Sequence, residues 1–152
     1  MTSDGKLSSV LHLLLHLNEA EAPLTSAQMA LAMGSNAVVA RRVLAGLRDA
    51  GIVSSSKGHG GGWVLTMKPE HVTLKAVYVA LGRPKLFAFG NRNDAPTCLV
   101  EQAVNSALGQ AMAKAETLLL SEMESVTLAS LARDFDGRLA AHGMSRSEIT
   151  HA

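Results

Sequence analysis

The stretch AGIVSSSKGHGGGWVLT, residues 50–66, holds two short apolar segments on either side of a basic, glycine-rich centre. Ile52–Ser55 and Trp63–Thr66 contain the β-branched and aromatic residues that favour strands. The glycines between 58 and 62 cannot pack a core, but they let the backbone turn tightly or approach another molecule. The stretch therefore predicts a two-stranded ribbon, a wing at about residues 52–66.

Three short helices are predicted ahead of this ribbon, over residues 6–19, 26–33 and 36–50. The first keeps its apolar residues at helical spacing and is interrupted by serines and histidines, so it is an amphipathic core helix rather than a secretory signal. Thr25 and Gln28 form a capping box for the second helix, and Ser35 or Asn36 caps the third. This order is typical of a winged helix-turn-helix domain, which we expect over residues 1–81.

The rest of the chain predicts a dimerisation region. A helix at 74–81 and a loop at 82–96 lead to a helix over 97–124, which at 1.5 Å per residue would reach ~40 Å. Its apolar face is longer than one small domain can cover, and the simplest partner is the same helix of a second subunit. The alternative is a bent helix wrapped on its own domain. The face expected in the dimer comprises Val100, Val104, Leu108, Ala111, Ala115 and Leu119.

A last helix at 128–135 completes the dimerisation helices, residues 97–135, and a frayed tail is expected over 136–152. The predicted fold is thus mainly α with a small β wing. It consists of a winged helix-turn-helix followed by a long C-terminal dimerisation helix.

Composition and charge indicate the kind of partner. The 152-residue chain is 47% hydrophobic and 3% aromatic, which suits one domain and disfavours a single-stranded nucleic-acid binder. Its net charge of +1 is uneven, with −2 on residues 1–34, +7 on 35–92 and −4 on 93–152. A cationic middle favours a polyanion as partner, and random surface charge is the alternative. No stretch approaches the ~20 apolar residues that span a bilayer, so we expect a cytoplasmic protein without membrane contact.

Cys98 is the only cysteine, so the chain cannot form an intrachain disulfide or a four-thiolate zinc or iron–sulfur site. It lies at the start of the predicted long helix, where the helix dipole favours a thiolate; the alternative is a small buried apolar side chain. His12 and His16 have the i, i+4 spacing of two metal ligands but no acidic partner between them. We therefore expect no metal site.

A family resemblance rests on four segments, AGIVS at 50–54, KGHGGGWVL at 57–65, VTL at 72–74 and VTLASL at 126–131. With them, residues 6–135 resemble the Rrf2 family of bacterial winged-helix transcription regulators, of the IscR, NsrR, CymR and YwnA type. The resemblance implies a homodimer with crossing long helices, each winged domain on half of a pseudo-palindromic operator in double-stranded DNA. Cluster-bearing members carry three cysteines where this chain has Cys98, so it is similar to the cluster-free members and no cofactor is expected.

The resemblance also implies a set of DNA-binding residues. The third helix would enter the major groove, with Val38, Arg41 and Arg42 reading bases and Ser35 and Asn36 contacting phosphates. The tip of the wing would approach the minor groove, where negative potential is concentrated. That tip comprises Lys57, Gly58, His59, Gly60 and Gly61. The family often has arginine at the position of the lysine, and lysine is less suited to bidentate base reading.

We expect a sequence-specific DNA-binding regulator, a homodimeric repressor that responds to a redox signal through Cys98 or to a small molecule. The alternative is a winged-helix protein-interaction module without operator binding, which would lack the steep salt dependence of DNA binding. An enzyme is not expected. The string His59–Trp63 imitates the oxyanion-hole loop of lipase-type hydrolases, but the chain has no Gly-x-Ser-x-Gly nucleophile elbow.

Overall fold

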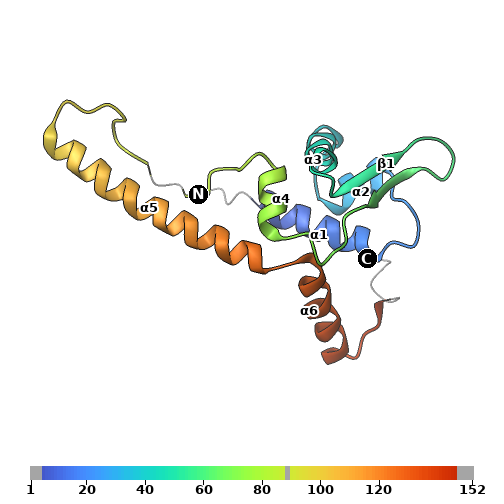
Figure 1. The fold of residues 1–152 in the computed structure, drawn as a ribbon. Helices are drawn as coiled ribbons and strands as arrows, with labels where there is room; N and C mark the ends of the chain where they lie inside the picture. The colour runs from blue at the N-terminus through green and yellow to red at the C-terminus, as the bar shows by residue number, and fades with distance from the viewer. Residues whose placement is uncertain (1–4, 88–89, 147–152) are drawn as a thin grey trace.

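The computed structural model describes residues 5–87 and 90–146, which form six helices and one two-stranded sheet (Figure 1). The elements are α1 (Lys6–Glu19), α2 (Ser26–Ala32), α3 (Ala37–Asp49), β1 (Val53–Ser56), β2 (Gly62–Leu65), α4 (Leu74–Ala80), α5 (Leu99–Ser125) and α6 (Leu128–Ala141). This is the predicted architecture, three helices and a wing followed by a long helix. None of the described helices combines the length and the apolar composition that a membrane crossing requires.

Apolar residues at helical spacing build the core of the winged domain. The inner faces of α1 and α3 bury Val10, Leu13, Leu14, Leu17, Ala40, Val43, Leu44 and Leu47. Each large aliphatic side chain removed from water contributes about 1.5–3 kcal/mol to folding. This packing fixes α3, so that the residues on its opposite face are presented to solvent.

Side-chain caps start the helices around the turn. Thr25 and Gln28 form the predicted capping box, in which the Thr25 Oγ1 accepts from the Gln28 amide at 3.2 Å and the Gln28 Oε1 accepts from the Thr25 amide at 2.8 Å. Asn36, rather than Ser35, caps α3, since its Oδ1 accepts from the amides of the second and third helical residues. A cap of this kind stabilises a helix by about 0.5–2 kcal/mol.

The end of α5 is joined to the winged domain by a backbone bridge. Thr73 and Thr127, the N-caps of α4 and α6, lie opposite each other in an isolated antiparallel bridge. The Leu74 amide donates to the Val126 carbonyl at 3.0 Å, and a reciprocal bond of 2.8 Å closes the bridge. From this point the 27-residue α5 extends outward, so that its start lies well away from the winged domain (Figure 1).

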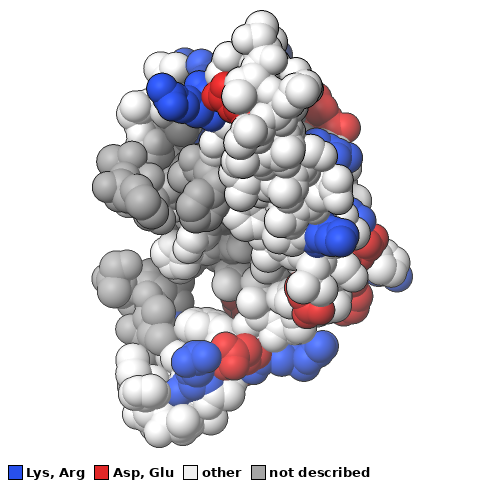
Figure 2. Space-filling view, turned by 90° about the vertical axis from the view of Figure 1, so that its left-hand side faces the viewer, with Lys and Arg blue, Asp and Glu red and all other residues white. Residues whose placement is uncertain are grey.

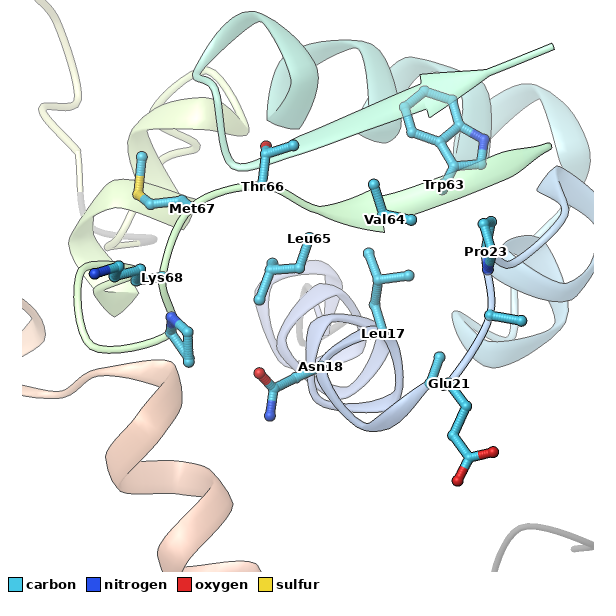
Figure 3. A pocket seen from close by; sticks show the side chains of 13 residues that line it. Leu17, Asn18, Glu21, Pro23, Trp63, Val64, Leu65, Thr66, Met67 and Lys68 are labelled. Atoms are coloured by element: carbon cyan, nitrogen blue, oxygen red, sulfur yellow. The ribbon is translucent and has the colours of Figure 1, made fainter.

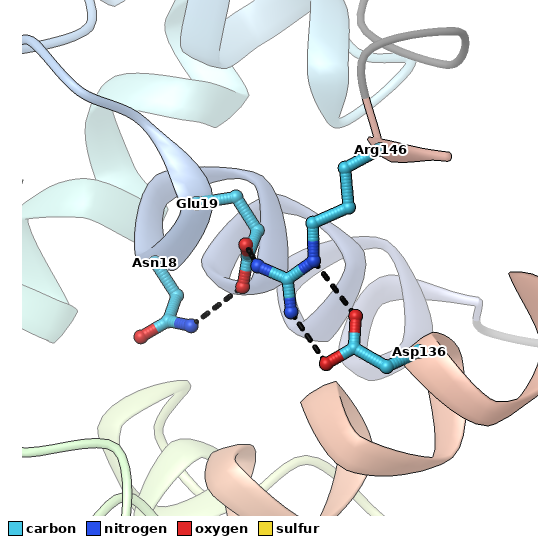
Figure 4. A network of polar contacts seen from close by, with 4 residues as sticks. All are labelled: Asn18, Glu19, Asp136 and Arg146. Atoms are coloured by element: carbon cyan, nitrogen blue, oxygen red, sulfur yellow. Dashed lines mark hydrogen bonds and ion pairs between the residues drawn. The ribbon is translucent and has the colours of Figure 1, made fainter. Parts of the chain in front are cut away.

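The predicted end of the last helix at residue 135, with a tail over 136–152, is wrong for the residues described. α6 continues to Ala141 and buries Leu139. Arg146 then forms a bidentate pair with Asp136, at 2.7 and 2.5 Å, and a second ion pair with Glu19 at the end of α1 (Figure 4). These contacts join residues far apart in sequence, so local periodicity gives no sign of them. Residues 147–152 of the predicted tail lie outside the described residues.

Gly46 permits the close approach of α3 to α4. A Cβ at position 46 would lie 2.4 Å from the carbonyl oxygen of Ala80, which is backbone and cannot turn aside. We expect Gly46→Ala to destabilise the protein by about 1–3 kcal/mol, although alanine normally favours a helix over glycine by about 1 kcal/mol. Gly137→Ala in α6 is the matched control, because nothing lies within 4 Å of its Cβ position. Thermal unfolding measures both, and equal midpoints would contradict the tight contact.

Candidate nucleic-acid interface

The exposed face of α3 carries the predicted base-reading residues. Val38, Arg41 and Arg42 are all exposed, on the side opposite the buried stripe of the helix. Val38 is 66% exposed, whereas Val43, Leu44 and Leu47 of the same helix are buried. The structure brings the three together on one face.

Neither arginine of this face is neutralised by the chain itself. Within residues 5–87 and 90–146, no ion pair or side-chain hydrogen bond involves Arg41 or Arg42, whereas Arg48 lies 3.6 Å from Asp49. Their guanidinium groups, each with five donors in a planar fork, are therefore available to an external acceptor. Guanine edges and phosphate oxygens are acceptors of that kind.

The start of α3 gives Ser35 and Asn36 different roles. Ser35 is half-buried in the turn after α2, and its amide donates to the Ala30 carbonyl at 3.1 Å. The carboxamide oxygen of Asn36 is used in the cap, so only its NH₂ group remains to donate to a phosphate. The chain's own capping therefore restricts how the predicted phosphate contact of Asn36 can be made.

The wing presents its basic tip to solvent. β1 and β2 pair in antiparallel register from Val53 opposite Leu65 to Ser56 opposite Gly62. Lys57, Gly58, His59 and Gly60 between them are exposed, and Gly61 is half-buried. Gly58 and Gly60 have φ values of 95° and 74°, which residues with a side chain rarely adopt. In Figure 1 the wing and α3 lie on the side of the winged domain that faces away from α6.

Trp63 connects the wing to the start of α2. The sequence contains no indication of this contact. Its amide and carbonyl form both hydrogen bonds of a bridge with Leu24, at 2.8 and 3.0 Å. Its indole Nε1 donates to the Ser26 hydroxyl at 3.0 Å. The wing therefore cannot move independently of the helices that precede α3. Because the partner of the indole lies 37 residues away in the sequence, no pattern of neighbouring residues predicts this contact.

A cavity of about 400 Å³ lies next to Trp63, between the end of α1 and β2 (Figure 3). Leu17, Leu65 and Met67 supply much of its apolar wall, and Glu21 and Lys68 are its charged lining residues. No histidine, cysteine or serine is among the described residues that line it. The described lining of the cavity therefore includes no imidazole that could act as a general base.

Cys98 is exposed, so the alternative of a buried apolar side chain is wrong. It occupies the N-cap position of α5, and hydrogen bonding by the backbone amides of Glu101 and Val100 lowers the pKa of its thiol. His12 and His16 lie on the outer face of α1 with their Nε2 atoms 3.0 Å apart. Burial, and secondarily the neighbouring His12, lower the pKa of His16, which favours the neutral ring.

α5 exposes a long apolar face. Val100, Val104 and Leu108 are 72%, 50% and 49% exposed, and Leu119 is 37% exposed. Ala111 and Ala115, the small residues of the same stripe, are also exposed. No charged residue occurs between Glu101 and Lys114. Seen from the end at which α5 begins, the molecule shows a broad uncharged area with charged side chains toward its edges (Figure 2).

The sequence matches a protein family over residues 3–134, nearly the whole chain. The family is described as "Rrf2: Iron-dependent Transcriptional regulator". No match was found among curated proteins.

Solved structures of regulators share the fold. A transcriptional regulator from Lactobacillus plantarum superposes with a TM-score of 0.73 at 19% identity, covering 93% of this chain and 97% of that one. CymR (YrzC), the global cysteine regulator of B. subtilis, gives 0.60 at 20% identity, with 88% and 96% covered. IscR of T. potens gives 0.61 at 21% identity, with 88% and 87% covered. The winged helix-turn-helix with a long helix is thereby confirmed.

Proposed function

Because the chain belongs to the Rrf2 family of transcriptional regulators, which bind DNA and are not enzymes, we propose that it is a homodimeric repressor of sequence-specific operators. The observation that carries the proposal is the exposed face of Val38, Arg41 and Arg42 on α3, with both guanidinium groups unpaired within the described chain. An α-helix fits the major groove of B-DNA, and this face has the donors and the apolar contact that base edges require.

Different residues would contribute specificity and affinity. Arg41 and Arg42 would donate to guanine edges, and the Val38 methyl groups would contact a thymine methyl. Lys57 at the wing tip would add a charge near the minor groove or a phosphate, which holds the complex without selecting a base. Ser35 and the Asn36 NH₂ group would fix the register of α3 on the phosphates.

Arg41→Ala and Lys57→Ala should therefore weaken binding in different ways. Loss of a base contact costs about 1–3 kcal/mol and relaxes preference at one base pair, whereas loss of a phosphate contact weakens all sequences and flattens the salt dependence. Fluorescence anisotropy on a selected operator and on random DNA, over a series of salt concentrations, measures both effects.

Arg133→Ala, at an exposed position of α6, is the control for the loss of one positive charge. It should change neither the base preference nor the salt dependence of binding. Equal loss on operator and random DNA for Arg41→Ala would remove this residue from base reading. Salt-independent binding, or no binding at all, would favour the protein-interaction module instead.

The exposed stripe of α5 is proposed as the dimer seam. Two copies packed through these residues would remove Val100, Val104 and Leu108 from water and place two winged domains on successive halves of a pseudo-palindrome. Recognition helices in such dimers stand about 34 Å apart, one turn of DNA.

Leu108→Glu combined with Leu119→Glu should convert a dimer into a monomer, since each copy would then bring two like charges into the seam. Sedimentation velocity at micromolar concentration measures the change. Gln110→Glu is the control for an added carboxylate, because it places one at an exposed position of α5 outside the stripe and should leave the dimer intact. A monomeric wild-type protein would contradict the proposed seam.

Iron as a resident cofactor does not fit the donor set of this chain, although the family description mentions it. Cys98 is the single thiol, and iron–sulfur clusters are held by several thiolates. No three His, Cys, Asp or Glu residues gather as a metal site in the part of the chain that the structure describes. We therefore propose regulation without a cluster, by oxidation of Cys98 or by a small molecule.

The redox alternative depends on an exposed thiol with a lowered pKa. Peroxide would convert the Cys98 thiolate to a sulfenic acid, which a second thiol would turn into a mixed disulfide. Since Cys98 occupies the N-cap position of α5, an adduct there would lie at the start of the proposed dimer helix. Cys98→Ser should then hold its operator in peroxide or diamide while wild type releases it, as gel-shift assays would measure. Identical behaviour of the two proteins would exclude Cys98 as the sensor.

A further inference from the structure

A second cavity, of about 260 Å³, lies where the segment after α4 meets the middle of α5. Its apolar wall includes Leu86, Phe87 and Met112, and its charged lining residues are Arg83, Lys85 and Glu116. The cavity has the size of a small metabolite rather than of a peptide. Apolar walls with a few charged groups are typical of sites for small molecules.

The backbone that forms one wall is held in a fixed and unfavourable conformation. The buried Tyr78 donates its hydroxyl proton to the Pro84 carbonyl at 2.9 Å, and the Arg83 amide donates to the Tyr78 carbonyl at 3.2 Å. Arg83 has a φ of 54°, the only positive φ among the described residues other than glycine. Such conformations cost free energy and are concentrated at ligand sites.

Charges of both signs border the cavity without neutralising one another. Among the described residues, neither Arg83 nor Lys85 forms an ion pair, and Glu116 forms none either. A guanidinium group binds a carboxylate through two parallel hydrogen bonds, and a carboxylate accepts from an ammonium group. A ligand that carries both charges would satisfy both sides at once.

We infer that this cavity binds a small zwitterion with an apolar body, an α-amino acid with an aliphatic side chain. Its carboxylate pairs with Arg83 and Lys85, its ammonium group with Glu116, and its side chain packs on the apolar wall. The inference that the ligand binds in the cavity depends on these residues alone, whereas an effect of the ligand on DNA binding rests on the proposed function.

The position of the cavity allows a bound ligand to affect both the apolar stripe of α5 and the exposed face of α3. Met112 and Glu116 are neighbours in α5 of Ala111 and Ala115 in the apolar stripe. On the other side, α4 ends at Ala80, whose carbonyl is in close contact with Gly46 of α3. A ligand that fixes the α4–α5 junction therefore acts on the dimer helix and on the recognition helix together.

Isothermal titration of the full chain, without DNA, tests the binding site. L-leucine should bind saturably, whereas 4-methylpentanoate, which lacks the ammonium group, and 3-methylbutylamine, which lacks the carboxylate, should each bind about tenfold or more weakly. Glu116→Gln and Lys85→Gln should lose affinity for L-leucine by a similar factor, as should Arg83→Gln if it folds.

Two control variants and one independent measurement complete the experiment. Glu122→Gln on α5 and Arg92→Gln in the preceding loop remove the same charges outside the cavity and should bind L-leucine as wild type does. If L-leucine, L-valine and L-methionine all fail to bind at millimolar concentration, or if the acid and the amine bind as well as L-leucine, the inference is wrong. Operator affinity with and without L-leucine is measured separately, so a failure to bind DNA overturns the proposed function and leaves the cavity result intact.

Discussion

The backbone bridge between Thr73 and Thr127 is the constraint on which the rest of the molecule depends. Each threonine caps one helix with its side chain, while the residues on either side of it make the two hydrogen bonds of the bridge. The neighbouring Val72 and Leu128 are fully buried, so water does not compete for these hydrogen bonds. Because α5 ends at this bridge, its far end extends beyond the winged domain (Figure 1), and its apolar stripe stays largely exposed within the described chain, from 72% at Val100 to 37% at Leu119.

The bridge is one of the links between α5 and the winged domain. Lys75 of α4 pairs with Glu124 of α5 at 2.6 Å, so the two helices are linked next to the bridge as well. α4 packs in turn on α3 through the contact of Ala80 with Gly46. A packed contact with so little space transmits displacement rather than absorbing it. The winged domain and the long helix therefore behave as connected parts.

Helix capping, turn glycines and helical periodicity predicted those features of the fold that depend only on residues close in the sequence. The capping box of Thr25, the glycine-rich wing and the periodicity of α3 each act within a few residues, so helix starts, the wing and the exposed arginines were predicted correctly. The extent of α6 was missed because it depends on Leu139 and on the pairing of Arg146 with Glu19, more than a hundred residues earlier in the sequence. For the same reason, no pattern could predict the indole of Trp63 on Ser26 or the meeting of the α4–α5 segment with Met112.

Net charge is distributed unevenly between the winged domain and the helices that follow it. The winged domain, residues 1–81, carries a net charge of +2, with +4 on residues 35–81, which contain α3 and the wing; residues 93–152, which contain α5 and α6, carry −4. A polyanion is therefore attracted more to the part of the chain with α3 and the wing than to α5 and α6. The exposed arginines of α3 and the exposed apolar stripe of α5 thus lie on different parts of one chain, so neither surface competes with the other for the same residues.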